Sequence, residues 1–395
     1  MCFAVGASSG QANTSFTQTV QAFYKSAANP DSSLRNIETE KNWDAVKAIG
    51  IPFIKDDSVA FLYRGEAKSI AWMGDFNGWG YNKDFQNKGK KIPDTNLWIL
   101  RCSFPKDARL DYKILVDETT WSLDPENPHH QWSGVGGGSP NSELRMPLWR
   151  EDAVLRPRSG IDHGVVKKDI LFTSKVLGYQ IMYSVYLPAG YESLGKLPVL
   201  YTTDGNEYLM PELGNITTIL DNLIADKSIK PIIAVLIDHR EPINRAHNRR
   251  MEELNMNEKY LRFFAYEFIP SIEGKYPIQR DAAHRAILGT SMGGLTAAYF
   301  AFSRPDLISM AGIQSPAFWT RPQIYDLCDN PNSPKVKVSL TSGLIHDASE
   351  GSRKMKDILQ NNACVYQYRE NNEGHSWGNW RNLIDDILID FFGKQ

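Results

Sequence analysis

The stretch GTSMG places a serine between two glycines where an apolar segment changes its pattern. Residues 286–288 end a run typical of a buried strand, and residues 295–300 are the small and apolar residues of a helix. A sharp strand-to-helix turn holds Ser291 in a strained conformation, and Gly289 and Gly293 let the two elements approach closely. Because such a turn exposes the hydroxyl, the pattern predicts nucleophilic catalysis by Ser291.

A serine nucleophile needs a base that takes its proton and a carboxylate that orients the base. In folds with this turn, the order along the chain is serine, acid, histidine. Only His346 and His375 follow Ser291. His375 lies in the polar loop NNEGHSWGNWR, and Asp347 comes just after the strand-like segment VKVSLTSG. We therefore predict a catalytic triad of Ser291, Asp347 and His375.

An alternative triad uses His346 as the base. It leaves Asp306 or Asp326 as the acid, and both lie in polar contexts typical of helix ends. Glu350 is a weaker rival of Asp347 for the acid. The pair of His375 and Asp347 is the better prediction.

Two backbone segments are candidates for stabilising a developing oxyanion. The N–H of Met292 lies at the predicted start of a helix, where donors have no partner within the helix. The segment VLYTTDGNEYL supplies a second donor, the N–H of Gly205 or of Asn206. The alternative for this segment is an ordinary Asp-Gly turn.

Two groups of side chains are candidates for substrate binding. The segment HREPINRAHNRR follows the strand-like PIIAVLID, and its Arg245 and Arg250 suit a multiply anionic substrate. Their alternative is a solvated helix start whose charges pair with each other. Trp319 and Trp377 are predicted to form an aromatic wall beside the site.

The elements that must position these residues change in type along the chain. Short apolar runs between Ser58 and Met146 predict an immunoglobulin-like β-sandwich that ends in a Gly- and Pro-rich connection. From Ile170 onward, nearly continuous apolar strands alternate with helices, as in a mostly parallel sheet covered on both faces. The predicted divisions are an N-terminal segment 1–45, a sandwich 46–150 and a catalytic domain 151–395.

Composition excludes several classes of partner and cofactor. The 395 residues carry a net charge of -2, which provides no field for nucleic acid or an anionic membrane surface. The four cysteines lack C-x-x-C spacing, so we expect neither a zinc site nor a dithiol motif, and no other metal or cofactor. No apolar run reaches the roughly 18 residues of a membrane span. The oligomeric state stays open.

The first residues, MCFAVGASSGQANTS, bear on the compartment. The small residues SSGQA resemble the cleavage end of a secretory signal, which favours a periplasmic or secreted protein. The alternative is the frayed terminus of a cytoplasmic protein.

Several segments of the catalytic domain together resemble one branch of the α/β hydrolases. These are LYTTDGNEYL, INRAHNRRMEEL, YEFIPSIEGKYP, GTSMGGLTAAYFAFSRPDLI, QSPAFW and GHSWGNWR, spread over residues 170–393. The branch is the enterochelin-esterase-like, or esterase D type, group. The resemblance implies an α/β-hydrolase fold with Ser291 as nucleophile, Asp347 as acid and His375 as base.

The N-terminal part carries two weaker resemblances. WMGDFNGW resembles the early-set sandwich known as carbohydrate-binding module 48, although core packing is the preferred interpretation of its tryptophans. LDPENP followed by NSELRMP resembles the segment that joins the two domains of enterochelin esterases.

The resemblances imply a serine esterase that needs no cofactor and acts on a small-molecule or oligosaccharide ester. An enterochelin-type siderophore ester is the first expectation for the substrate, and a feruloyl or acetyl ester of plant xylan is the alternative. Acyl transfer to a sugar and carbohydrate binding without catalysis are less favoured.

Overall fold

The computed structural model describes residues 10–134, 139–330 and 335–393. The chain divides into two compact units. The first unit consists of Met1–Arg150 together with Asn372–Gly374, and the second of Glu151–Asn371 with His375–Gln395. Three residues that we had placed in the catalytic domain therefore group with the N-terminal unit.

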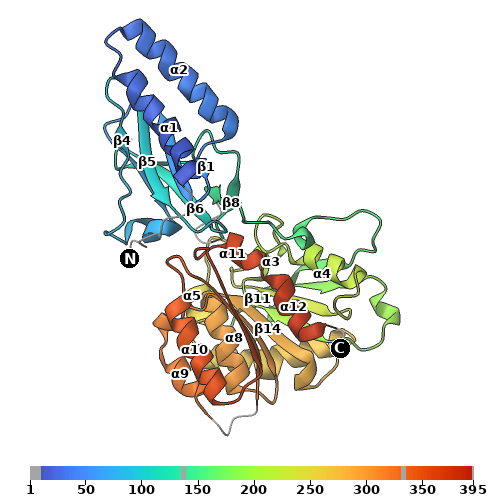
Figure 1. Cartoon of the computed structure of the whole chain (residues 1–395). Helices are drawn as coiled ribbons and strands as arrows, with labels where there is room; N and C mark the ends of the chain where they lie inside the picture. The colour runs from blue at the N-terminus through green and yellow to red at the C-terminus, as the bar shows by residue number, and fades with distance from the viewer. Residues whose placement is uncertain (1–9, 135–138, 331–334, 394–395) are drawn as a thin grey trace. The chain divides into compact units, whose positions relative to one another are not determined.

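Two helices open the N-terminal unit, α1 (Gly10–Ala27) and α2 (Ser32–Ile49), and Figure 1 shows them side by side. The side chain of Asp31 caps α2 by accepting hydrogen bonds from two N–H groups of its first turn. Phe16 and Trp43 pack into a cluster that also holds Phe53 of the neighbouring sheet. The first turns of α2 are polar in sequence, so the Asp31 cap is the clearest local signal for where this helix begins. Ser8 and Ser9 of the segment SSGQA lie outside the described residues.

The predicted sandwich consists of two antiparallel sheets. Phe61 of the first sheet packs against Trp72 and Tyr112 of the second, with ring centroids 5.9 and 5.1 Å apart. The first sheet has the order β1 (Phe53–Lys55), β2 (Ser58–Arg64), β5 (Leu97–Ser103) and β4 (Lys90–Lys91). The second has the order β3 (Ile70–Gly74), β6 (Arg109–Val116), β9 (Pro140–Arg145) and β8 (His130–Trp132), and β7 (Thr120–Ser122) pairs with β6.

The segment that we predicted as an irregular connection contains two of these strands, β8 and β9. That prediction was wrong in part, because β9 pairs with β6 along the register from Arg109–Arg145 to Tyr112–Ser142. Its polar side chains are buried against other polar groups, so the strand lacks the apolar alternation that would reveal it. Residues 135–138 of the connection lie outside the described part of the chain.

The second unit is built on one eight-stranded sheet. Its strands from β13 to β17 are parallel, and β10 and β11 add an antiparallel edge. The order is β10 (Val165–Thr173), β11 (Gln180–Leu187), β13 (Ile233–Asp238), β12 (Val199–Thr202), β14 (Arg285–Thr290), β15 (Met310–Gln314), β16 (Lys337–Gly343) and β17 (Tyr366–Asn371).

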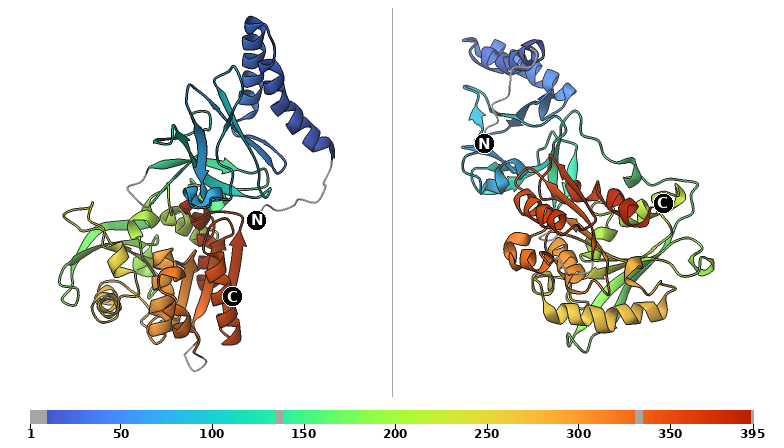
Figure 2. Two further views of the ribbon diagram at one scale, coloured as in Figure 1. Left: turned by 90° about the vertical axis from the view of Figure 1, so that its left-hand side faces the viewer. Right: turned by 60° about the horizontal axis from the view of Figure 1, so that its bottom comes forward.

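Helices cover both faces of this sheet (Figure 2). Alternate residues of β13 show why: Val235 packs into one apolar cluster and Leu236 into the other. One cluster includes α6 (Glu258–Phe263), α7 (Ile269–Lys275), α8 (Met292–Ser303), α9 (Gln323–Cys328) and α10 (Ser349–Asn361). The other includes α3 (Gly205–Leu209), α4 (Ile216–Ala225), α11 (Trp377–Arg381) and α12 (Ile384–Phe392). The short helix α5 spans Arg250–Glu253.

This architecture confirms the predicted fold class, a mostly parallel sheet flanked by helices and preceded by a β-sandwich. Within the described ranges, no helix is both long and apolar enough to cross a membrane. Parallel strands present their carboxyl ends at one edge of the sheet, where ligands of such sheets bind. The segments that follow the strands from β12 to β17 carry the predicted site residues to that edge.

Candidate active site

Ser291 lies at the turn between β14 and α8 in a conformation that few residues other than glycine adopt. Its backbone angles are φ 56° and ψ -115°. The surrounding backbone holds this conformation, because the Ser291 N–H donates to Gln314 O at 2.9 Å and its carbonyl accepts from Ala317 N at 2.9 Å. The strain is therefore fixed by β15 and the segment that follows it.

The two flanking glycines are required by close packing. A Cβ atom on Gly289 would lie 2.3 Å from the backbone of Gly293. A Cβ atom on Gly293 would lie 2.2 Å from Thr203 Oγ1. Neither space admits a side chain, so the strand and the helix approach each other only because both residues are glycine.

The structure brings the three predicted triad residues together in hydrogen-bond contact. His375 Nε2 lies 2.9 Å from Ser291 Oγ, and His375 Nδ1 lies 2.6 Å from Asp347 Oδ1. With the proton on Nδ1, the ring donates to the carboxylate and leaves Nε2 to accept from the serine hydroxyl. This arrangement is what a general base for Ser291 requires.

The carboxylate of Asp347 is held by more than the histidine. Its other oxygen accepts from Ser315 Oγ and from the N–H of Gly343, both at 2.5 Å. The Asp347 side chain is fully buried. Trp380 Nε1 in turn donates to Ser315 Oγ at 2.9 Å, and its ring meets the His375 ring edge-on at 5.0 Å.

Sequence reasoning missed Ser315 and Trp380 as parts of the site. Both lie in segments that carried the family resemblance, QSPAFW and GHSWGNWR. Ser315 lies beside the acid because β15 pairs with β16, and Trp380 reaches Ser315 from α11. The sequence offers no local signal for either contact.

The predicted oxyanion donors lie at the first turns of two helices. Met292 is the first residue of α8, and Gly205 and Asn206 are the first two residues of α3. N–H groups at these positions have no acceptor within their own helix. A Cβ atom on Gly205 would lie 2.2 Å from the backbone of Leu236, so α3 begins in close contact with β13. Their role in binding an oxyanion stays a prediction.

The alternative triad residues lie in other environments. His346 and Glu350 are exposed. Asp306 forms an ion pair with Arg304 at 2.7 Å, and Asp326 is exposed on α9. His375 and Asp347 are the residues that contact the serine and its base.

The predicted substrate-binding arginines both have carboxylate partners. The partly buried Arg250 donates to both oxygens of Asp204, at 2.7 and 2.9 Å, and to Thr290 O at 3.2 Å. Arg245 is partly exposed and lies 3.2 Å from Asp238 and 3.6 Å from Asp169. Arg250 thus connects Asp204, the residue before Gly205, with Thr290, the residue before Ser291. Arg245 remains in contact with solvent.

The two predicted tryptophans differ sharply in exposure. Trp319 is 61% exposed, and its ring centroid lies 6.0 Å from that of His375. Trp377 is only 2% exposed and packs against Tyr208. The structure therefore offers Trp319, but not Trp377, as a ring face that is open beside the base.

Trp377 has a different polar partner. Its Nε1 donates to Glu207 Oε2 at 2.6 Å. Burial, reinforced by the neighbouring Asp204 carboxylate, raises the pKa of Glu207 to about 7. A protonatable carboxyl group therefore lies on α3, the helix that carries two of the predicted oxyanion donors.

Within residues 10–134, 139–330 and 335–393, no group of three or more His, Cys, Asp or Glu side chains is arranged so that it could hold a metal ion.

Comparisons with known proteins bear on the family and the fold of the chain. Residues 174–391 match the model of a family described as "Putative esterase". The chain is 26% identical over 287 residues to the iron(III) enterobactin esterase of Escherichia coli, a match that covers 68% of this chain and 67% of that protein. It is 30% identical over 240 residues to an endo-1,4-beta-xylanase/feruloyl esterase of Xylanibacter ruminicola, with 58% of this chain but only 32% of that longer protein covered.

Solved structures share the fold. The enterobactin esterase of Shigella flexneri superposes with a TM-score of 0.69 at 20% identity, over 85% of this chain and 92% of its own. The ferric enterobactin esterase of Salmonella typhimurium gives a TM-score of 0.69 at 18% identity, over 85% and 93% of the two chains. A ferulic acid esterase gives 0.50 at 24% identity over 58% of this chain and 98% of its own.

Proposed function

The chain belongs to this esterase family, and we propose that it hydrolyses carboxylic esters through an acyl-enzyme formed on Ser291. The observation that carries the proposal is the continuous set of hydrogen bonds from Ser291 through His375 to Asp347. These three residues come from turns after different strands, and chance packing rarely gives this order of donor and acceptor.

The reaction follows from the arrangement of these groups. His375 Nε2 accepts the hydroxyl proton while Ser291 Oγ attacks the ester carbonyl. The N–H groups of Met292 and of Gly205 or Asn206 stabilise the negative oxygen of the tetrahedral intermediate. His375 then gives its proton to the departing alcohol, and the acyl group stays on the serine.

Water completes the cycle. It attacks the acyl-enzyme and gives its proton to His375, and collapse of the second tetrahedral intermediate returns that proton to Ser291 Oγ. Throughout, Asp347 keeps the proton-bearing Nδ1 of His375 in place and stabilises the imidazolium that forms at each step.

For the substrate, we propose an ester of the enterobactin class, a lactone that carries catechol rings and binds ferric iron. The aligned region shared with the Escherichia coli enterobactin esterase covers 68% of this chain, a larger share than residues 151–395 provide. The likeness therefore extends into the N-terminal unit.

Two side chains suit such a substrate. Trp319 offers an exposed aromatic face beside the base, on which a catechol ring can pack. Arg245 is a partly exposed cation. Its contact with Asp238 leaves further guanidinium donors for an anionic catecholate.

A feruloyl ester of xylan is the second candidate. The relative from Xylanibacter ruminicola, whose name includes feruloyl esterase, supports it. The exposed ring of Trp319 suits a feruloyl group equally well, so the anionic charge of the substrate is what separates the two candidates.

Incubation of the protein with ferric enterobactin and, separately, with feruloylated arabinoxylan tests both the activity and the substrate. We expect dihydroxybenzoyl-serine products from the first and little ferulic acid from the second. The Ser291→Ala variant is the control and should release neither. Release of ferulic acid alone would favour the second candidate, and equal release by wild type and Ser291→Ala would exclude the serine mechanism.

A further inference from the structure

The three residues directly before the catalytic base belong to the N-terminal unit. The strand β17 ends at Asn371, residues Asn372–Gly374 group with the first 150 residues, and His375 returns to the second unit. The base therefore follows, without any spacer, a short segment whose contacts are those of the β-sandwich unit.

The backbone of this segment is held by β6. Arg109 N–H donates to Asn372 O at 3.3 Å, and Arg109 forms a parallel bridge with Glu373. The side chain of Asn372 donates to Asp107 Oδ1 at 2.8 Å. Each of these contacts fixes the direction in which the chain leaves toward His375.

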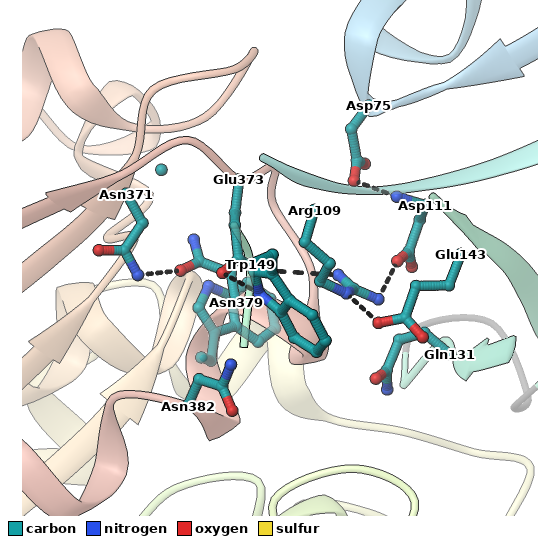
Figure 3. A network of polar contacts seen from close by, with 12 residues as sticks. Asp75, Arg109, Asp111, Gln131, Glu143, Trp149, Asn371, Glu373, Asn379 and Asn382 are labelled. Carbon is teal, nitrogen blue, oxygen red and sulfur yellow. Dashed lines mark hydrogen bonds and ion pairs between the residues drawn. The ribbon is translucent and has the colours of Figure 1, made fainter. Parts of the chain in front are cut away.

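Glu373 enters a buried ionic cluster, drawn in Figure 3. Its Oε1 accepts from Trp149 Nε1 at 3.2 Å, and its Oε2 lies 3.9 Å from Arg109 Nη1. The fully buried guanidinium of Arg109 also binds Asp111 and Glu143, each at 2.5 Å. The cluster thus connects the segment to β6, to β9 and to the residues after β9.

Gly374 completes the contact. A Cβ atom at this position would lie 2.3 Å from Asp75 Cγ. Asp75 is itself held by hydrogen bonds from Asp111 N at 2.8 Å and from Trp79 Nε1 at 3.1 Å. Asp75 cannot move without losing these bonds. Residue 374 must therefore be glycine for the segment to lie this close to Asp75.

We propose that Glu373, held by Arg109 and Trp149, is a positioning residue that sets the place of His375 relative to Ser291. The link between this cluster and the base is the chain itself, because Gly374 directly precedes His375. It rests on the proposed esterase function. A displacement of about 1 Å at a catalytic group can lower the rate about a hundredfold, so the accuracy of this segment matters.

A buried ionic cluster often contributes little net stability, since apolar residues of the same volume can stabilise the fold as much or more. What it does provide is a fixed geometry, because charged hydrogen bonds hold Arg109 against Asp111 and Glu143. Trp149 donates to the Glu373 carboxyl group beside them. A fixed geometry suits a segment that must place a base within hydrogen-bond distance of a serine.

The protonation state of Glu373 decides which substitution imitates it most closely. Burial raises its pKa to about 8, against the opposing effect of Arg109, so the carboxyl group holds its proton at neutral pH. The Glu373→Gln variant keeps the shape and the hydrogen-bonding capacity of that neutral group, whereas Glu373→Ala removes the contacts with Arg109 and Trp149.

The test compares kcat and KM for p-nitrophenyl acetate at pH 7 in the full chain. We expect Glu373→Ala to lower kcat about ten- to a hundredfold with KM unchanged within about twofold, and Glu373→Gln to keep at least about a third of kcat. The matched control is Tyr112→Phe, since Tyr112 lies on β6 as Arg109 does. Its hydroxyl donates to Asp124 and accepts from Asn127, and this variant removes both buried hydrogen bonds while leaving the contacts of residues 372–374 in place. This control should keep its kcat.

A second pair of variants covers the case in which Glu373→Ala fails to fold. Gly374→Ala should lower kcat because the new methyl group must displace the segment from Asp75. Adding Asp75→Gly makes room for that methyl group and should restore part of the lost kcat. The downfield NMR signal of the proton between His375 Nδ1 and Asp347 should weaken in Gly374→Ala and recover in the double variant.

Unchanged kcat and an unchanged His375 signal in folded Glu373→Ala or Gly374→Ala would overturn the proposal. The same conclusion would follow if Tyr112→Phe lowered kcat as much as Glu373→Ala, because the effect would then be a general loss of sandwich stability. Failure of the esterase function itself is distinguishable: wild type would then show no hydrolysis beyond Ser291→Ala, while the NMR signal would still report the position of His375.

Discussion

Asp347 accepts three hydrogen bonds with its two carboxylate oxygens, from His375, Ser315 and the N–H of Gly343. Hydrogen bonds from both sides fix the plane of the carboxylate and so the plane of the imidazole. The ring of Trp380 further limits the imidazole by packing on it edge-on. Orientation of the base is therefore set by groups that do not touch the ester.

The two histidines that follow Ser291 give a direct test at the residue scale. His375→Ala removes the base, and we expect kcat for an ester to fall on the order of a million-fold, as for the loss of a triad histidine in other serine hydrolases. His346→Ala changes an exposed residue and should leave kcat within about twofold. Steady-state assays with p-nitrophenyl acetate measure both, and a reversed order would assign the base to His346.

Arg250 and Arg245 should differ in the esters that they affect. Arg250→Ala leaves Asp204 without its partner at the turn before Gly205, so we expect about a tenfold or greater loss of kcat/KM on charged and neutral esters alike. Arg245→Ala should raise KM about tenfold for a ferric catecholate and leave p-nitrophenyl acetate unaffected. Equal effects of Arg245→Ala on both esters would argue against a substrate contact.

The sequence predicts the residues that carry chemistry better than those that support them. Ser291, Asp347 and His375 each follow a recognisable strand or lie in a distinctive loop, and the structure brings them into contact. The burial of Trp377 could not be predicted, because a tryptophan in a glycine-containing loop fits a site wall and a core equally well. Only its packing against Tyr208 decides between the two.

At the scale of elements, the crossing of β14 and α8 creates the reactive serine. The two elements approach until the backbone of Gly293 contacts Gly289, and Thr203, directly after β12, fills the remaining space. The strained conformation of Ser291 is the geometric result of that approach.

The variant Gly293→Ala tests this account of the turn. Its methyl group would lie 2.2 Å from Thr203 Oγ1, so β12 or α8 must shift. We expect a loss of about 1–3 kcal/mol in the free energy of unfolding and about a hundredfold loss of kcat, since a shift of α8 moves Ser291 from His375. Urea titration and ester kinetics measure the two effects. Wild-type kcat in this variant would contradict the requirement for close contact.

Several elements were predicted only in part, for identifiable reasons. The helix α2 was not predicted, because few residues of its first turns are apolar; Asp31 caps it and Trp43 packs it against the sheet. The strand β9 was missed because its buried residues are polar and pair with groups of the ionic cluster around Arg109. The hydrophobic pattern of a sequence indicates which segments bury apolar side chains. The strand β9 buries mainly polar side chains, and α2 buries few side chains of any kind.

At the scale of the whole molecule, buried carboxyl groups should govern the dependence of stability on pH. Burial raises the pKa of Asp75 to about 7, of Asp124 to about 6 and of Asp385 to about 7. Glu207 and Glu373 are raised to about 7 and about 8. Between about pH 4 and these raised values, each group keeps its proton in the folded protein. The same group has already lost its proton in the unfolded chain.

The sign of the effect follows from linkage. Between the ordinary carboxyl values near 4 and the raised values, the folded state binds more protons, so the free energy of unfolding falls as pH rises. The stabilisation is complete below about pH 4 for these groups and is lost as pH passes through 6 to 8.

We therefore expect the free energy of unfolding to be at least about 1.4 kcal/mol larger at pH 5.5 than at pH 8.5, a tenfold difference in the unfolding equilibrium. Urea titrations at the two values measure it. The Glu373→Gln variant should show a smaller difference in stability between the two pH values, because the amide in place of the Glu373 carboxyl group does not ionise. Equal stability at both values in wild type would contradict the account.

The membership of residues 372–374 in the N-terminal unit is the feature of the whole molecule furthest from prediction. Asn372 and Asp107, which share a hydrogen bond, are 265 residues apart in the chain. A local sequence pattern cannot predict a contact between residues so far apart. The division near residue 150 could be predicted, because there the sequence changes from short strands to alternating strands and helices.

The acyl-enzyme on Ser291 carries an added acyl mass, which mass spectrometry detects in the peptide that contains this residue. The protein is mixed with p-nitrophenyl acetate, quenched in acid during the pre-steady-state phase and digested for peptide mapping. We predict one acetyl group, located on Ser291, and none in Ser291→Ala treated in the same way. Rapid hydrolysis of the ester with no adduct on Ser291, or with an adduct at another residue that persists in Ser291→Ala, would contradict the account.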